Sequence, residues 1–241
     1  MFRHRGKSLT LAHNLRLASL LSFVAGIVNV TGLFAVQRLT TNVTGHFAYF
    51  ADEMAKKNFQ TAVVYLLFIL AFFSGAFFSN TLVEVISKRN MRFINSIPVG
   101  IEISILVFIA LLSQPRIAMH ANSIACALLF AMGLQNALVT SLSNAIVRTT
   151  HLTGLFTDLG IEVSQLLFYK KEEQQQRLKS SIKLRLTIIC FFFLGGIVGG
   201  LGYLLYGIRI LLLATLTLVI ALVYDSVRFR IVTLKRKYMG P

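Results

Sequence analysis

The chain has 241 residues, 56% of them hydrophobic, and a mean hydropathy of +0.72. A soluble domain has about 45–50% apolar residues, so the composition argues against that class. The net charge of +15 is compatible with nucleic-acid binding, but Lys and Arg lie mainly at the termini and between apolar stretches, as in membrane proteins. We therefore expect a lipid bilayer, and no nucleic acid, as partner.

The apolar stretches, taken in chain order, predict an all-α polytopic membrane protein with one domain over residues 1–241. No strand alternation is visible, which argues against an outer-membrane barrel. The first stretch lacks a signal-peptide cleavage site and is predicted to be retained. About six stretches have the length and composition expected of transmembrane helices: residues 15–36, 61–83, 97–112, 121–142, 186–206 and 210–227.

Two polar segments interrupt this series, at residues 40–55 and 143–169. Each follows a Gly-x-x-Asn element, and each contains Thr-Thr, then Thr-Gly, then an acidic residue. The same order of residues therefore occurs twice: Gly26, Asn29, Thr40, Thr41, Thr44 and Gly45 in the first copy, and Gly133, Asn136, Thr149, Thr150, Thr153 and Gly154 in the second.

The basic loops predict cytoplasmic N- and C-termini in a bacterial inner membrane, because positive residues remain on the cytoplasmic side. Repeat one covers about residues 15–113, and repeat two about residues 121–228. Each repeat contains three spans, an odd number, so the second would have the opposite orientation. The sequence predicts an inverted-topology repeat, which is common in secondary transporters.

Non-helical backbone at membrane depth is tolerated only inside protein or along a wet cavity. We expect Thr44-Gly45 and Thr153-Gly154 to cap and begin two half-helices, either re-entrant or interfacial, whose positive dipole ends suit an anion or polar solute. The alternative is that these residues only cap interfacial helices and join neighbouring helices. The predicted substrate-binding residues are Asn29, Thr41, Thr44, Gly45, Gln135, Asn136, Thr150, Thr153 and Gly154.

Three acidic residues allow two interpretations, a functional site or a solvated or interfacial side chain. Asp158 and Glu162 are four residues apart, so they share a helix face. Asp158 is predicted to be the coupling acid if that face is buried, and both are simply solvated if the segment is interfacial. Glu102 lies within the third span and either extends to the headgroups, pairs with Arg92, or serves a function.

The glycine-rich stretch at residues 195–202 predicts close helix contacts, because small residues four apart let helices approach. Gly195 and Gly199 would contact another span of the same chain, or the same span in a homodimer. The histidines lack the spacing of a zinc helix, and no nucleotide-binding or hydrolase motif is present. We expect no metal, no cofactor and no enzymatic activity.

The motifs resemble those of the YoaK-like bacterial membrane proteins, a domain of unknown function. The second half carries the family's pattern at Ala131, Met132, Gly133, Gln135, Asn136, Thr149, Thr150, Thr153 and Gly154. The first half matches at Gly26 and Thr44-Gly45, with Asn29 where the family usually has Asp. The resemblance implies an integral inner-membrane protein and brings no activity or substrate.

The sequence favours a small secondary transporter or channel-like permease for a small polar or anionic solute. The alternative is a non-transporting membrane scaffold or assembly partner. Such a scaffold would act through helix packing and the charged segment at residues 170–179.

Overall fold

The computed structural model describes residues 11–87, 96–143 and 147–224, and within these ranges it contains helices and no strand. The basic N-terminal segment, the loop with Lys88, Arg89 and Arg92, and the basic tail lie outside the described residues. The helices are α1 (Leu11–Val36), α2 (Val43–Ala55), α3 (Phe59–Ser87), α4 (Ser96–Ala110), α5 (Gln114–Met119), α6 (Ala121–Leu142), α7 (Leu152–Phe168) and α8 (Glu172–Tyr206), then the 3-10 turn η1 (Gly207–Ile210) and a helix over residues 211–224.

Four helical runs among the described residues are long and apolar enough to cross a membrane: residues 14–36, 59–86, 121–142 and 172–224. The last run includes the turn at Gly207, whose φ of +60° suits glycine, and this confirms the predicted turn. The α4 helix has 15 residues, which corresponds to about 22 Å and is shorter than a typical hydrocarbon core. The fold is thus that of a helical membrane protein.

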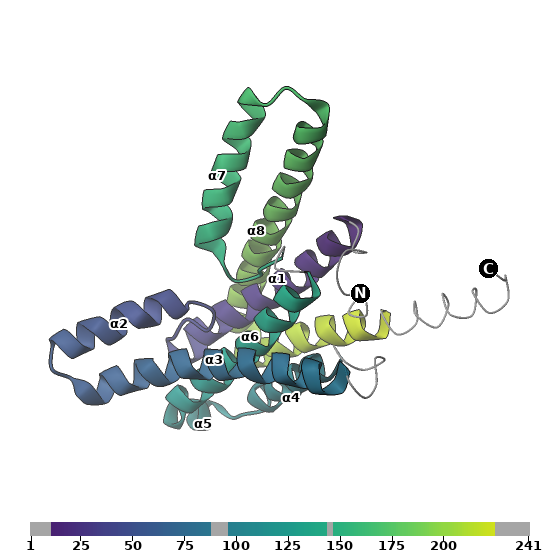
Figure 1. The fold of residues 1–241 in the computed structure, drawn as a ribbon. Helices are drawn as coiled ribbons and strands as arrows, with labels where there is room; N and C mark the ends of the chain where they lie inside the picture. Colours follow the sequence, from purple (N-terminus) through teal and green to yellow (C-terminus); the bar gives the residue numbers. More distant parts are fainter. Residues whose placement is uncertain (1–10, 88–95, 144–146, 225–241) are drawn as a thin grey trace.

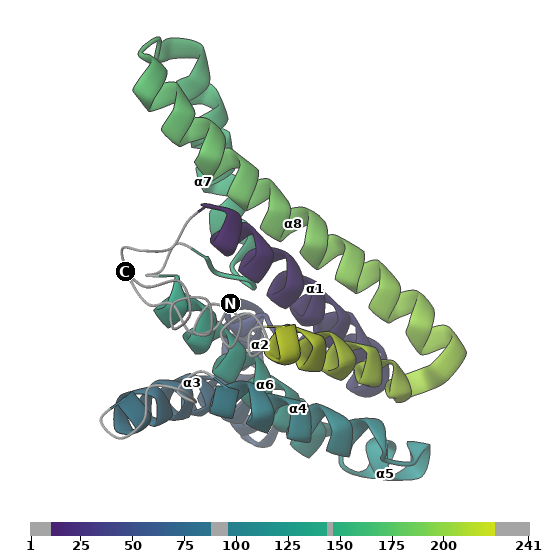
Figure 2. The ribbon, with the colours of Figure 1, turned by 90° about the vertical axis from the view of Figure 1, so that its right-hand side faces the viewer.

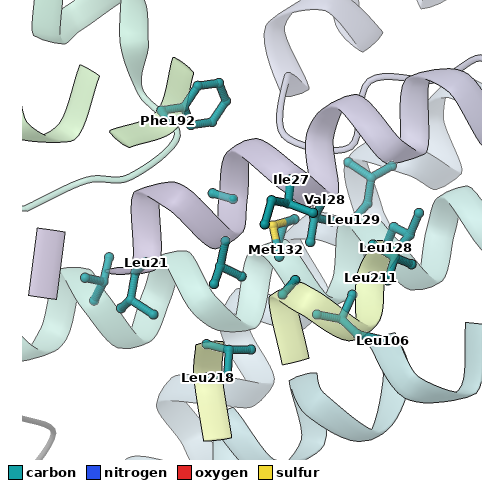
Figure 3. Packing of buried hydrophobic residues seen from close by; sticks show 14 of the residues in the cluster. Leu21, Ile27, Val28, Leu106, Leu128, Leu129, Met132, Phe192, Leu211 and Leu218 are labelled. Carbon is teal, nitrogen blue, oxygen red and sulfur yellow. The ribbon is translucent and has the colours of Figure 1, made fainter. Parts of the chain in front are cut away.

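Two tight helix pairs form the centre of the molecule. The α1 helix packs most extensively on α8, and α3 on α6, while α1 and α6 join the two pairs. Figure 2 shows α1 running alongside α8. Where the two pairs meet, Ile27 of α1 packs with Leu128 and Met132 of α6. Leu106 of α4 and Leu211 complete this part of the core (Figure 3).

Each tight pair is closed by a reciprocal contact between glycine and phenylalanine backbone. A Cβ on Gly26 would overlap the carbonyl oxygen of Phe192, and one on Gly195 would overlap that of Phe23. The other pair has the same arrangement, Gly75 with Phe130 and Gly133 with Phe72. All four glycines therefore occur as Phe-x-x-Gly and allow helices to approach as only small residues permit.

The glycine contacts settle where Gly195 and Gly199 are used. Gly195 faces Phe23 and Gly199 faces Ile27, both on α1. These two glycines are buried within one chain, so the alternative of a homodimer through them is wrong and the intramolecular alternative is correct. A neighbouring helix already occupies the space that a second copy would need.

Two helical hairpins extend from this centre in different directions, α2 with α3 and α7 with α8 (Figure 1). The charged segment at residues 170–179 is not a separate element. It forms the turn before α8 and the first turns of that helix, which continues to Tyr206 without a break. The connection expected at residues 113–120 also contains a short helix, α5.

Candidate functional site

The two half-helices begin one residue before the threonines that were expected to cap them. Asn42 is the N-cap of α2, and its Oδ1 accepts a hydrogen bond from the Gly45 amide at 2.9 Å. His151 has the same position before α7. The prediction that Thr44 and Thr153 are N-caps is therefore wrong, because both lie in the first turn of their helix.

The glycine three residues after each cap makes room for the cap side chain. A Cβ on Gly154 would overlap the imidazole of His151, and a Cβ on Gly45 would lie 2.9 Å from Nδ2 of Asn42. The glycine of each Thr-Gly pair thus leaves space for the cap side chain. It leaves the following backbone N–H groups at the positive end of each helix dipole.

The first break is anchored to α1 by two threonines. The Thr40 hydroxyl donates to the carbonyl oxygen of Val28 at 3.2 Å, and the Thr41 hydroxyl donates to Oδ1 of Asn29 at 2.9 Å. Burying a hydroxyl is favourable only when it is bonded. These bonds therefore fix the non-helical segment against the last turns of α1.

Both half-helix starts line one cavity of about 760 Å³. Seven of the ten residues predicted to act at the site lie in its wall, three from the first break, two from the second and two asparagines. The described lining residues are Asn29, Leu39, Thr41, Asn42, Val43, Thr44, Gly45, Ala48, Phe72, Asn136, Thr150, His151, Leu152, Thr153 and Phe192. Segments about 110 residues apart in the sequence thus form one partly open cavity with both polar and apolar walls.

The cavity wall offers hydrogen bonds and helix ends rather than full charges. None of its described lining residues is Asp, Glu, Lys or Arg. Oδ1 of Asn136 is buried and has no hydrogen-bond partner among the described residues, whereas Oδ1 of Asn29 is occupied by Thr41. The cavity wall therefore presents two helix N-termini, which favour negative or polar groups, while the Asn136 acceptor lies buried beneath it.

Gly154 and Asp158, two of the three other predicted residues, line a neighbouring hollow of about 480 Å³ that shares His151 with the cavity. Asp158 accepts a hydrogen bond from Nη1 of Arg185 at 2.7 Å. The same guanidinium binds both oxygens of Glu162, at 2.8 and 3.0 Å. Asp158 and Glu162 do share one face, but they use it to bind α7 to α8. The assignment of Asp158 as a coupling acid stays a prediction.

Gln135, the last of the ten, points away from the cavity. Its Nε2 donates to Oε1 of Glu102 at 3.0 Å, and both side chains are buried, with 1% and 0% of their surface exposed. Glu102 therefore does not extend to the headgroups. Neither an ion pair nor a hydrogen bond to a basic residue is found for Glu102 among the described residues.

His46 is a buried polar residue in the first turn of α2. Its Nε2 donates to the carbonyl oxygen of Leu39 at 2.7 Å, and its ring packs on Tyr65 and Phe68. Burial lowers the pKa of His46, the hydrogen bond to Leu39 raises it, and nearby Arg38 lowers it further. The lowered pKa favours the neutral ring, which supports the loop leading into α2.

Sequence reasoning missed several residues of the site. Phe72 and Phe192 line the cavity because their backbones contact Gly133 and Gly26. The Phe-x-x-Gly pattern, present in both halves, was the signal for them. Arg185 lies at the boundary of the predicted fifth span, where the sequence gives no information about its partner.

Comparison with known proteins gives a family and no activity. A family model described as "Protein of unknown function (DUF1275)" matches residues 17–224. The UPF0700 transmembrane protein YoaK of Bacillus subtilis (strain 168) is 26% identical over 192 residues, which is 79% of this chain and 84% of that protein. No solved structure matches. These findings confirm the resemblance indicated by the motifs.

Proposed function

The chain belongs to the DUF1275 family, and from its cavity we propose that it is a small secondary transporter or channel-like permease for a small polar or anionic solute. The observation that carries this proposal is the chamber of about 760 Å³ between the starts of α2 and α7. Binding sites for small molecules have volumes of about 300–1,000 Å³. The chamber is therefore of a size that suits a small solute and is lined by groups that would bind one.

The proposed roles follow from the chemistry of the wall. Backbone N–H groups at the starts of α2 and α7 would bind the negative or electron-rich part of the solute. The hydroxyls of Thr44, Thr150 and Thr153 would bind its polar groups. No step in this scheme breaks a covalent bond, so we propose no enzymatic activity and no cofactor.

We extend the proposal to an inverted-topology repeat with six spans, α1 to α4 corresponding to α6 through the helix at residues 211–224. Three features support it. In each half a short amphipathic helix, α2 or α7, folds back on the next long helix. The first helix of each half packs on the second long helix of the other, α1 on α8 and α6 on α3. The same Phe-x-x-Gly contact closes both pairs.

The proposed orientation places both termini in the cytoplasm of a bacterial cell, with the chain in its inner membrane. It rests on the distribution of Lys and Arg in the sequence. Cysteine substitutions at Thr44 and Thr153, labelled from each side of the membrane, would test it. Free labelling of both from a single side contradicts two half-helices that approach from opposite leaflets.

Uptake by reconstituted liposomes tests the function. Purified protein would be assayed with a panel of radiolabelled inorganic and small organic anions and neutral polar solutes. We expect flux of at least one solute, and a reduction of about 10- to 150-fold in Thr153→Val, since losing one hydrogen bond to a charged group costs about 1.5–3 kcal/mol. Thr157→Val is the matched control, because its hydroxyl is exposed and bonds the Thr153 carbonyl outside the cavity. Equal flux in the two variants would contradict the assigned role of Thr153.

A scaffold function is the second candidate, favoured by the hairpin of α7 and α8 that extends from the helix bundle (Figure 1). Its exposed surface carries Phe156, Leu167 and Phe168. Crosslinking from this hairpin would capture one constant protein partner if the scaffold alternative holds, and no solute in the panel would then cross the liposome.

A further inference from the structure

One buried pair of side chains has an incomplete set of hydrogen bonds. Glu102 on α4 and Gln135 on α6 are joined by a single bond, from Nε2 of Gln135 to Oε1 of Glu102 at 3.0 Å. Oε2 of Glu102 and Oε1 of Gln135 are both buried, and neither has a hydrogen-bond partner within the described part of the chain. Two acceptor oxygens are thus left unsatisfied in the same pair.

A single proton supplies the missing donor. A carboxylic acid and a primary amide can form two hydrogen bonds, one from N–H to the carboxyl oxygen and one from O–H to the amide oxygen. Protonation of Glu102 would therefore let the two unsatisfied oxygens bond each other. An ionised Glu102 would leave a buried charge with one neutral partner, which is strongly unfavourable.

Among the residues that the structure describes, none near the pair provides a charge that compensates an ionised carboxylate. The α4 helix packs against α6, α3 and η1, and the core joins it to the last helix. The described titratable groups on these elements are Cys126 on α6, Tyr65 and Glu84 on α3, Arg209 in η1 and Tyr224. None is hydrogen-bonded to Glu102.

The position of Gln135 connects the pair to the cavity. The next residue, Asn136, lines the cavity. Consecutive residues of α6 thus face the Glu102 carboxyl on one side and the solute chamber on the other. A change in the hydrogen bond between Gln135 and Glu102 would therefore act on α6 at the point where this helix lines the cavity.

We propose that Glu102 and Gln135 form a proton-binding site that couples the permease to the proton gradient. The inference rests on the proposed function. The carboxylate takes up a proton from water on one side of the membrane and becomes a neutral acid bonded to Gln135. It later releases the same proton to the other side, with no electron transfer.

Infrared spectroscopy of the purified full chain tests the proton site without any solute. At neutral pH the wild type is expected to show the C=O band of a protonated carboxyl, which Glu102→Gln removes. Glu173→Gln is the matched control, because that carboxyl is exposed and paired with Arg177, and it should leave the band unchanged. Gln135→Leu retains the acid and should shift its band to higher frequency, since the carbonyl loses its donor. A spectrum without a band that depends on Glu102 would overturn the proposal.

Solute flux tests the coupling role and compares it with the assignment of Asp158. Liposomes loaded with a pH-sensitive dye would receive the same solute panel under an imposed pH gradient. We expect flux to follow the gradient in the wild type and in Asp158→Asn, and Glu102→Gln to lose that dependence.

The outcomes separate this proposal from the one it rests on. Equal pH dependence in the wild type and Glu102→Gln would overturn the coupling role while leaving the permease intact. Loss of the dependence in Asp158→Asn alone would assign coupling to Asp158 instead. If no solute crosses, the permease and the coupling role both fail, whatever the infrared band shows.

Discussion

The tight glycine contacts give the sharpest test of the fold. In Gly133→Ala the new Cβ would overlap the carbonyl oxygen of Phe72 and lie 3.0 Å from the Ala76 amide nitrogen. Both are backbone atoms, so α6 and α3 must separate. Overpacking of this kind costs about 1–3 kcal/mol, and replacing glycine by alanine within a helix recovers about 1 kcal/mol. We therefore expect the free energy of unfolding to fall by up to about 2 kcal/mol.

Gly100→Ala is the matched control, because no atom lies within 4 Å of a Cβ at that position of α4. It should gain up to about 1 kcal/mol from helix propensity alone. Reversible unfolding in detergent, followed by far-UV circular dichroism, would measure the difference between the two variants. If Gly133→Ala is as stable as Gly100→Ala, the close approach of α3 and α6 is wrong.

A double substitution tests whether the contacts act in pairs. Gly75 and Gly133 close the same helix pair, so once one alanine has separated α3 from α6, a second should cost less than it does alone. Gly26 belongs to the other pair, formed by α1 and α8. Its effect should add to that of Gly133, and equal coupling in both combinations would refute the paired arrangement.

Three further predictions concern polar contacts. Arg185→Leu removes the hydrogen bonds to Glu162 and Asp158 and should loosen α7 from α8 by about 1–3 kcal/mol, visible as faster amide hydrogen exchange in α7 and unchanged exchange in α3. Thr41→Val breaks the bond to Asn29 and should lower the free energy of unfolding by about 1 kcal/mol, with Thr41→Ser close to wild type. The lowered pKa of His46 means that the unfolded chain binds its proton more tightly than the folded one, so stability should be full above about pH 6.5 and fall as the pH drops below it. In His46→Gln this fall should be smaller; an unchanged profile between pH 7 and 5 would show that another group is responsible.

Much of the cavity could be predicted because its residues occur in a repeated order. Thr44 and Thr153 were placed together only by the duplication, since neither segment indicates a site alone. The predicted N-cap of each half-helix lies two residues after the observed N-cap. A threonine followed by glycine suits an N-cap, but the side chains of Asn42 and His151 lie over the following glycines and begin each helix earlier.

The partners of the acidic residues could not be predicted, for a physical reason. The bonds that Glu102 and Asp158 make join different helices, Glu102 to Gln135 and Asp158 to Arg185. Such contacts depend on the rotation and depth of each helix, which packing against neighbours determines. The spacing of Asp158 and Glu162 predicted their common face correctly, but it left open whether that face meets solvent, a proton or a cation.

The glycine contacts and the cavity are parts of one arrangement. Phe192 and Phe72 contribute both a backbone oxygen to a tight pair and a surface to the cavity wall. Asn29 and Asn136 lie three residues after Gly26 and Gly133, so the same contacts that close the pairs also fix the positions of the two asparagines. Helices in backbone contact resist sliding, because packed interfaces are bistable rather than continuously deformable. Any motion that changes the shape of the cavity would therefore occur between the two pairs, where α1 meets α6, and the start of α2 would follow α1 through the bonds of Thr40 and Thr41.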